Sequence, residues 1–119
     1  MKPRAILAFL AAAVLGASVW ALSPLLAGHG EPWDASGPYY VSMLAIAGAI
    51  SGGLFPRPLS AHYLGAVTGQ AVYELLFLDI GPLFLLGLLF LLGYSVVFLA
   101  AAAAAAFVRL RHASDPNAN

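Results

Sequence analysis

The chain has 119 residues, of which 62% are hydrophobic and 8% are charged, and its formal net charge is zero. Because a soluble domain carries roughly a quarter charged residues, this chain has too few polar side chains to cover a water-exposed surface. The balanced charge provides no basic surface for nucleic acid. The absence of cysteine excludes disulfide bonds, thiolate metal sites and cysteine nucleophiles. The composition therefore predicts an integral membrane protein whose main partner is the lipid bilayer.

Four segments are long and apolar enough to be predicted as membrane-spanning helices. A spanning helix needs about 20 apolar residues, since each advances about 1.5 Å through a hydrocarbon core about 30 Å thick. The expected spans are residues 5–27, 38–55, 59–78 and 82–108. Short connections make neighbouring spans antiparallel, so we expect an all-α membrane protein with two helical hairpins. Residues 1–111 would form this single domain, and residues 112–119 a polar, disordered tail.

Proline and glycine mark the limits of these spans. Gly37-Pro38 and Gly81-Pro82 each place proline at the start of a helix, where its missing N–H is not needed. The segment 56–58, Pro-Arg-Pro, predicts a tight turn between the second and third spans. The first span also has features of a signal peptide, but its apolar run is longer than a usual signal core, so we expect it to be retained.

The basic residues predict the orientation of the chain. All five lie on one side of the four-span arrangement, namely Lys2, Arg4, Arg57, Arg109 and Arg111. By the positive-inside rule this side is cytoplasmic. Both termini are therefore expected in the cytoplasm, with the protein in a cell membrane, most naturally the bacterial inner membrane.

The opposite side combines aromatic rings with a short polar loop. The aromatic residues expected near the outer headgroups are Trp20, Trp33, Tyr39 and Tyr40. The loop carries one nitrogen ligand and two carboxylates, at His29, Glu31 and Asp34. Three such residues in a glycine-proline loop are more typical of a solvated turn than of a metal site, so we expect neither metal nor cofactor.

Small residues predict how the helices pack. Membrane helices associate by close packing, which glycine permits, and the second and third spans each contain a Gly-xxx-Gly step. These steps are Gly48 to Gly52 and Gly65 to Gly69. We expect the second and third spans to pack against each other through these glycines. The alternative is that one of the two faces packs between copies of the chain.

The third span carries a polar stripe, which is the candidate functional site. At about 100° per residue, five polar side chains share one face of the helix, namely His62, Tyr63, Gln70, Tyr73 and Glu74. Thr68 lies on the opposite face. Glu74 is the only carboxylate inside a span, and such residues face the protein interior or water.

Two interpretations of this stripe stay open. A protonatable carboxylate beside Gln70 and Tyr73 is able to carry a proton or hold a cation. Alternatively, Glu74 hydrogen-bonds to its neighbours and only fastens helices together. His62 lies near the cytoplasmic end, where an interfacial position is expected rather than a catalytic one.

The sequence contains no catalytic motif. It has no phosphate-binding glycine loop, no His-Glu-xx-His pair and no serine elbow. We therefore expect a non-enzymatic subunit or assembly factor of a membrane complex, with a protein partner or further copies of itself. The alternative is a small oligomeric transporter or channel that uses Gln70 and Glu74. A membrane enzyme acting on lipid or quinone is a third and less supported hypothesis.

Overall fold

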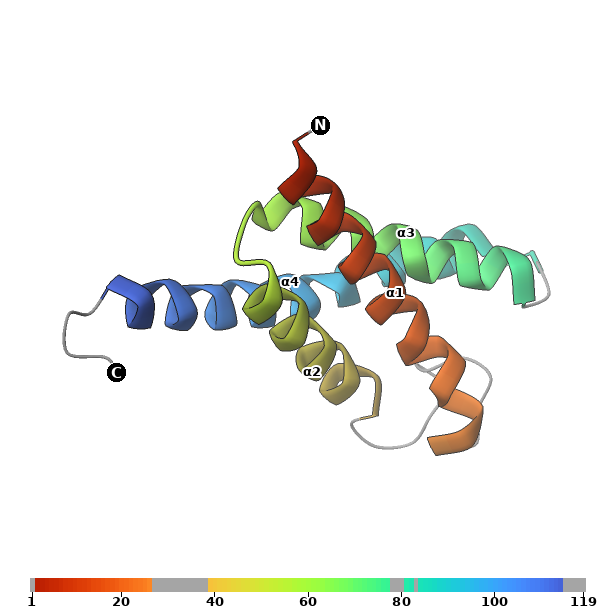
Figure 1. Ribbon diagram of the computed structural model, residues 1–119. Coiled ribbons are helices and arrows are strands. Elements are labelled where there is room, and N and C mark those ends of the chain that lie inside the picture. The colour runs from red at the N-terminus through yellow and green to blue at the C-terminus, as the bar shows by residue number, and fades with distance from the viewer. Residues whose placement is uncertain (1, 27–38, 78–80, 83, 115–119) are drawn as a thin grey trace.

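The computed structural model describes residues 2–26, 39–77, 81–82 and 84–114, and all regular structure within these ranges is helical. The helices are α1 (Pro3–Leu26), α2 (Tyr39–Leu54), α3 (Leu59–Phe77) and α4 (Phe84–Ser114). Figure 1 shows α1 and α2 crossing α3 and α4, with the long α4 running behind the other helices. The all-helical class and the four helices are confirmed.

The helix limits follow the apolar segments closely, except at the end of α4. The first three helices begin and end within two residues of the predicted spans. Helix α4 continues to Ser114, so the expected tail beginning at His112 is wrong for its first three residues. Alanine and arginine are strong helix formers, and the helix persists until the sequence approaches Asp115-Pro116, which disfavours helix. Residues 115–119 lie outside the described residues.

The helices pair differently from the prediction. Helix α1 packs most extensively on α3, and α2 on α4, whereas α2 and α3 make only slight contact. Helix α4 also contacts α3, and α1 contacts α2. The expectation that the second and third spans pack tightly together was therefore wrong, although their glycines do lie in helix interfaces.

The glycine steps lie at the two most extensive helix interfaces. Gly48 and Gly52 of α2 face the α4 backbone at Phe98 and Ala102, and a methyl group at Gly48 would lie 3.0 Å from the Phe98 Cα. Gly65 and Gly69 of α3 face the α1 backbone in the same way, at Phe9 and Ala13. Each glycine lacks a side chain that would hold the neighbouring helix away, so the α4 and α1 backbones approach α2 and α3 closely at these positions.

The bundle encloses several polar side chains within an apolar core and exposes many large apolar ones. Among the described residues, the buried polar side chains are Ser23, Ser51, His62, Gln70, Glu74 and Ser95. Large aliphatic side chains of all four helices face outward, such as Leu25, Leu54, Leu76 and Leu85. This distribution is the reverse of the one found in water-soluble domains.

Two of the helices are long and apolar enough to cross a bilayer, judged by length and composition. These segments are Pro3–Leu25 and Phe84–Ala113, and Tyr39–Leu54 is a shorter apolar helix. Only 28% of the most apolar window of the first segment is buried, and 17% of that of the second. A core helix of a soluble protein would be mostly buried, so these two helices do not have that character.

Candidate functional site

One buried side chain, that of Gln70 in α3, hydrogen-bonds to each of the other three helices. Its Oε1 accepts hydrogen bonds from Trp20 Nε1 of α1 at 2.9 Å and from the Tyr40 hydroxyl of α2 at 2.5 Å. Its Nε2 donates to Ser95 Oγ of α4 at 2.9 Å and to the Ala66 carbonyl of its own helix at 3.0 Å. A carboxamide has two donors and two acceptor positions, so Gln70 uses all four.

Aromatic rings surround this network on the side where α1 ends and α2 begins. The Tyr40 ring meets Trp20 edge to face, with centroids 6.2 Å apart, and lies 4.8 Å from the Tyr94 ring of α4. The neighbouring Tyr39 donates a hydrogen bond from its hydroxyl to the Val19 carbonyl at 2.6 Å. These contacts fix both donors that face Gln70 and tie the first turn of α2 to the last turns of α1.

Two of the aromatic residues expected near the outer headgroups are enclosed by the bundle. Trp20 is 0% exposed and Tyr40 is 4% exposed, so protein encloses both rings. Their polar atoms have a hydrogen-bond acceptor inside the bundle and do not need the headgroup region to satisfy them. Tyr39 is half-buried, and Trp33 lies outside the described residues.

Glu74 lies one helical turn beyond Gln70 on α3 and faces the same interior. It is 5% exposed, and its carboxyl group is close enough to Tyr40 to interact with the hydroxyl electrostatically. Burying a charged carboxylate in apolar surroundings is costly, so this position favours polar neighbours. The interior of the bundle therefore holds Gln70 and Glu74 together, as the helical spacing predicted.

Tyr73 does not join Gln70 and Glu74 in the interior. Its half-buried ring packs against Phe77 at a centroid distance of 4.8 Å. It also lines a cavity of about 280 Å³ between α1 and α3, whose other walls are largely apolar. The candidate site therefore contains fewer residues than the predicted stripe.

Two further residues were placed by helical spacing, Tyr63 on the polar face of α3 and Thr68 on the opposite face. Tyr63 is half-buried, and its hydroxyl donates to the Leu92 carbonyl of α4 at 2.8 Å. Thr68 is exposed on the opposite face of α3.

His62 forms a second buried cluster, which shares no hydrogen-bond partner with Gln70. It is 0% exposed, so its side chain is enclosed by protein rather than lying at the interface as expected. Its Nε2 lies 2.5 Å from the Phe55 carbonyl, and its Nδ1 lies 2.7 Å from Ser51 Oγ. Because a carbonyl oxygen only accepts, Nε2 carries a proton, and in the neutral ring Nδ1 accepts from Ser51. The pair ties the end of α2 to the first turn of α3.

The chemistry available to these clusters is limited by access. Ser51 and His62 have the spacing of a nucleophile and its base, yet both are 0% exposed, so no substrate reaches them in this conformation. Among the residues that the structure describes, no three His, Asp or Glu side chains are grouped closely enough to hold a metal ion. The loop residues His29, Glu31 and Asp34 lie outside that part of the chain.

The sequence reasoning found Gln70 but missed its partners. Trp20, Tyr40 and Ser95 lie 25 to 50 residues away in sequence and come from three other helices. A glutamine within an apolar helix needs two donors and two acceptors from its surroundings, and that requirement was the available signal. Which residues meet it depends on the helix pairing, which was predicted incorrectly.

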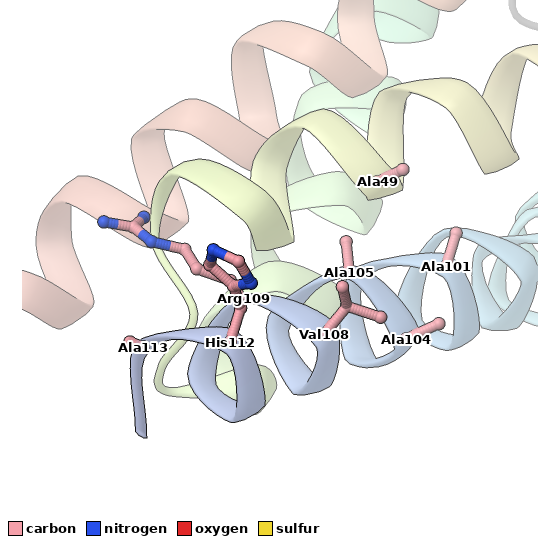
Figure 2. Close-up of a pocket in the computed structure, with 8 residues that line it drawn as sticks. All are labelled: Ala49, Ala101, Ala104, Ala105, Val108, Arg109, His112 and Ala113. Atoms are coloured by element: carbon pink, nitrogen blue, oxygen red, sulfur yellow. The ribbon is translucent and has the colours of Figure 1, made fainter. Parts of the chain in front are cut away.

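Four of the cavities along the described surface are lined neither by Gln70, Glu74 and His62 nor by the side chains that hydrogen-bond to Gln70 and His62, although Phe55 lines one of the four. Figure 2 shows one of them, a volume of about 780 Å³ between Ala49 of α2 and the alanine-rich face of α4.

No family model, curated protein or solved structure matches this chain.

Proposed function

We propose that this protein is a multi-pass membrane protein that crosses the bilayer four times and serves as a non-enzymatic subunit or assembly factor of a membrane complex. The observation that carries the proposal is the reversed distribution of polarity. Gln70, Glu74 and His62 are enclosed, while large aliphatic side chains on every helix face outward. Exposed apolar surface on this scale is unfavourable in water and suits lipid or a partner helix.

Helix α3 is the least apolar of the four, and its exposed surface supports its place among the spans. Its three most polar side chains are buried in the bundle. The outward positions include Leu64, Val72 and Leu76, which are 55%, 44% and 70% exposed. Because its polar side chains face the bundle and its apolar ones face outward, α3 presents apolar side chains to lipid despite its polar sequence.

The arrangement of basic residues supports the proposed orientation. Arg4, Arg57 and Arg109 come from three distant parts of the chain and line one cavity. A single basic end of the bundle fits the positive-inside rule, with both termini in the cytoplasm. Reporter fusions after residue 119 and within residues 27–38 test this. A cytoplasmic fluorescent protein at the first site and an active periplasmic phosphatase at the second are expected, and the reverse pattern would refute the orientation.

The subunit role is supported by how the interior polar groups are used. All four positions on the Gln70 amide and both ring nitrogens of His62 are engaged, and three of the Gln70 bonds and the His62–Ser51 bond join α3 to another helix. Groups occupied in this way stabilise the bundle and are not available to a passing solute. The outward apolar faces then remain for lipid and for partner helices.

The test of the subunit role is crosslinking in the native membrane, followed by gentle detergent extraction and identification of the attached chains. We expect a reproducible set of other membrane proteins, joined to residues on the exposed faces of the helices. Recovery of this chain alone, monodisperse and uncrosslinked to any other protein, would contradict the proposal.

A second candidate function is a small oligomeric transporter, and the burial of Glu74 favours it. A carboxyl group that is 5% exposed beside Gln70 has the setting of an intramembrane proton or cation site. In proteoliposomes, Glu74→Gln would then abolish proton-coupled or cation flux, whereas Thr68→Val, at an exposed position of the same helix, would not. Flux that is absent from the parent protein, or unchanged by Glu74→Gln, removes this function.

A further inference from the structure

The basic end of the bundle contains a cavity that the proposed function does not use. Its volume is about 470 Å³, and it lies where α1 begins, α2 ends and α4 makes its last turns. Arg4, Arg57 and Arg109 contribute to its walls together with apolar side chains such as Leu7 and Leu54. Among the described residues that line it, none is acidic. Three guanidinium groups around one concave surface create a positive potential that attracts anions.

Arg109 is held in place at this cavity by the helix that it faces. Its Nη1 donates to the Gly53 carbonyl at 2.5 Å and to the Leu54 carbonyl at 2.7 Å, at the end of α2. Figure 2 shows the side chain reaching away from α4. These bonds satisfy carbonyls at the C-terminus of α2, where a positive charge is favourable. They use both N–H groups of Nη1 and leave the N–H groups of Nε and Nη2 to face an anion.

A largely apolar groove adjoins the cavity. Its volume is about 1020 Å³, and it lies between the start of α3 and the alanine-rich part of α4. Leu59, Ala104 and Phe107 are among its walls, and Arg57 and Leu110 line both the groove and the cavity. An anion bound among the arginines therefore has the apolar walls of the groove beside it.

We propose that the cavity and the groove form one site for an anionic phospholipid of the cytoplasmic leaflet. The lipid phosphate binds among Arg4, Arg57 and Arg109, and an acyl chain lies in the groove along Ala104 and Phe107. Guanidinium groups pair well with phosphate oxygens, and basic pockets between helices on the cytoplasmic side select anionic headgroups. The inference rests on the proposed membrane location. The apolar groove distinguishes a lipid from a free phosphate, which would need only the arginines.

The test uses the full chain in neutral detergent and native mass spectrometry. Phosphatidylglycerol is titrated against phosphatidylcholine with the same acyl chains, and inorganic phosphate and glycerol 3-phosphate are titrated separately. We expect a preference of about tenfold or more for phosphatidylglycerol and no comparable binding of the two soluble phosphates. Since a basic side chain near an anionic membrane contributes about a fivefold change in affinity, Arg4→Gln and Arg57→Gln should each weaken phosphatidylglycerol binding about fivefold.

Lys2→Gln is the matched control, because it removes the same charge two residues from Arg4 and Lys2 does not line the cavity. Its affinity for phosphatidylglycerol should stay within about twofold of the parent. Ala104→Phe places a ring in the groove at an exposed position, so it should weaken phosphatidylglycerol binding while leaving all three arginines in place.

Three results would overturn the lipid site. They are equal affinity for the two lipids, an equal loss in Lys2→Gln and Arg4→Gln, and binding of glycerol 3-phosphate as tight as that of phosphatidylglycerol. Each of these is measured on protein that needs detergent to stay in solution. Failure of the lipid site is therefore distinguishable from failure of the proposed membrane location, which would be seen as a chain that is stable without detergent.

Discussion

Replacing Gln70 with leucine removes the hydrogen bonds that join α3 to the other three helices, while the side-chain volume changes little. Three of the four bonds cross between helices, and their partners are Trp20, Tyr40 and Ser95. A hydrogen bond between membrane helices contributes about 0.6 kcal/mol on average and up to about 1.7 kcal/mol. Three bonds give about 2 kcal/mol, and the loss of a shared acceptor for two buried donors raises the expected cost to about 2–4 kcal/mol.

The assay is reversible unfolding in mixed micelles, driven by a denaturing detergent and followed by far-ultraviolet circular dichroism and tryptophan fluorescence. Thr68→Leu is the control on the same helix. Thr68 is exposed, so this change should alter the free energy of unfolding by less than about 0.5 kcal/mol. If Gln70→Leu were as stable as Thr68→Leu, the network would not hold the bundle together and the reasoning would be refuted.

A double-mutant cycle separates the hydrogen bonds from general packing. Tyr40→Phe removes one of the donors to Gln70, so it should destabilise the parent protein. In the Gln70→Leu background the acceptor is already gone, and Tyr40→Phe should cost clearly less. We expect a coupling energy of about 0.5–2 kcal/mol, and strict additivity of the two changes would contradict the assigned bond.

The remaining predictions concern helix packing and the histidine cluster. Gly69→Val inserts a branched side chain where the Ala13 backbone already lies, so it should destabilise the bundle by about 3 kcal/mol or more in the same assay. Gly53→Ala, where an added methyl group meets nothing within 4 Å, should stay within about 0.5 kcal/mol of the parent. Ser51→Ala removes the hydroxyl that faces His62 and should lower the free energy of unfolding by about 1–3 kcal/mol. Ser51→Thr should retain part of the hydrogen bond. Equal stability of Ser51→Ala and the parent would rule out a structural role for this pair.

The helix limits could be predicted because they depend on local sequence. Apolar runs set the position of each helix, and the Gly-Pro and Pro-Arg-Pro segments interrupt them. The end of α4 was placed too early because the polar residues after Val108 suggested a tail. Arginine and alanine nevertheless favour helix up to Ser114, where the sequence approaches Pro116. Charge alone was therefore a poor indicator of where this helix ends.

The helix pairing could not be predicted because it depends on shape across the bundle. The glycine steps were recognised as packing surfaces, but each step fits any smooth helix backbone. In the structure Gly48 faces the α4 backbone and Gly69 faces the α1 backbone, and the local sequence around the two glycines does not distinguish these partners from other helices. Trp20 and Tyr40 reach Gln70 in that arrangement of the helices. Because the helix pairing was predicted incorrectly, these hydrogen-bond partners of Gln70 were not predicted either.

The most direct test of the central claim is to measure which surfaces of the bundle contact lipid. The native chain has no cysteine, so single cysteines can be introduced and spin-labelled at Leu10, Ile46, Val72 and Val96, one exposed position on each helix. In proteoliposomes we predict frequent collisions with oxygen and few with a water-soluble nickel complex at all four positions. Frequent collisions with the nickel complex at these positions would show that water surrounds the apolar faces, and would contradict a bundle that crosses the membrane four times.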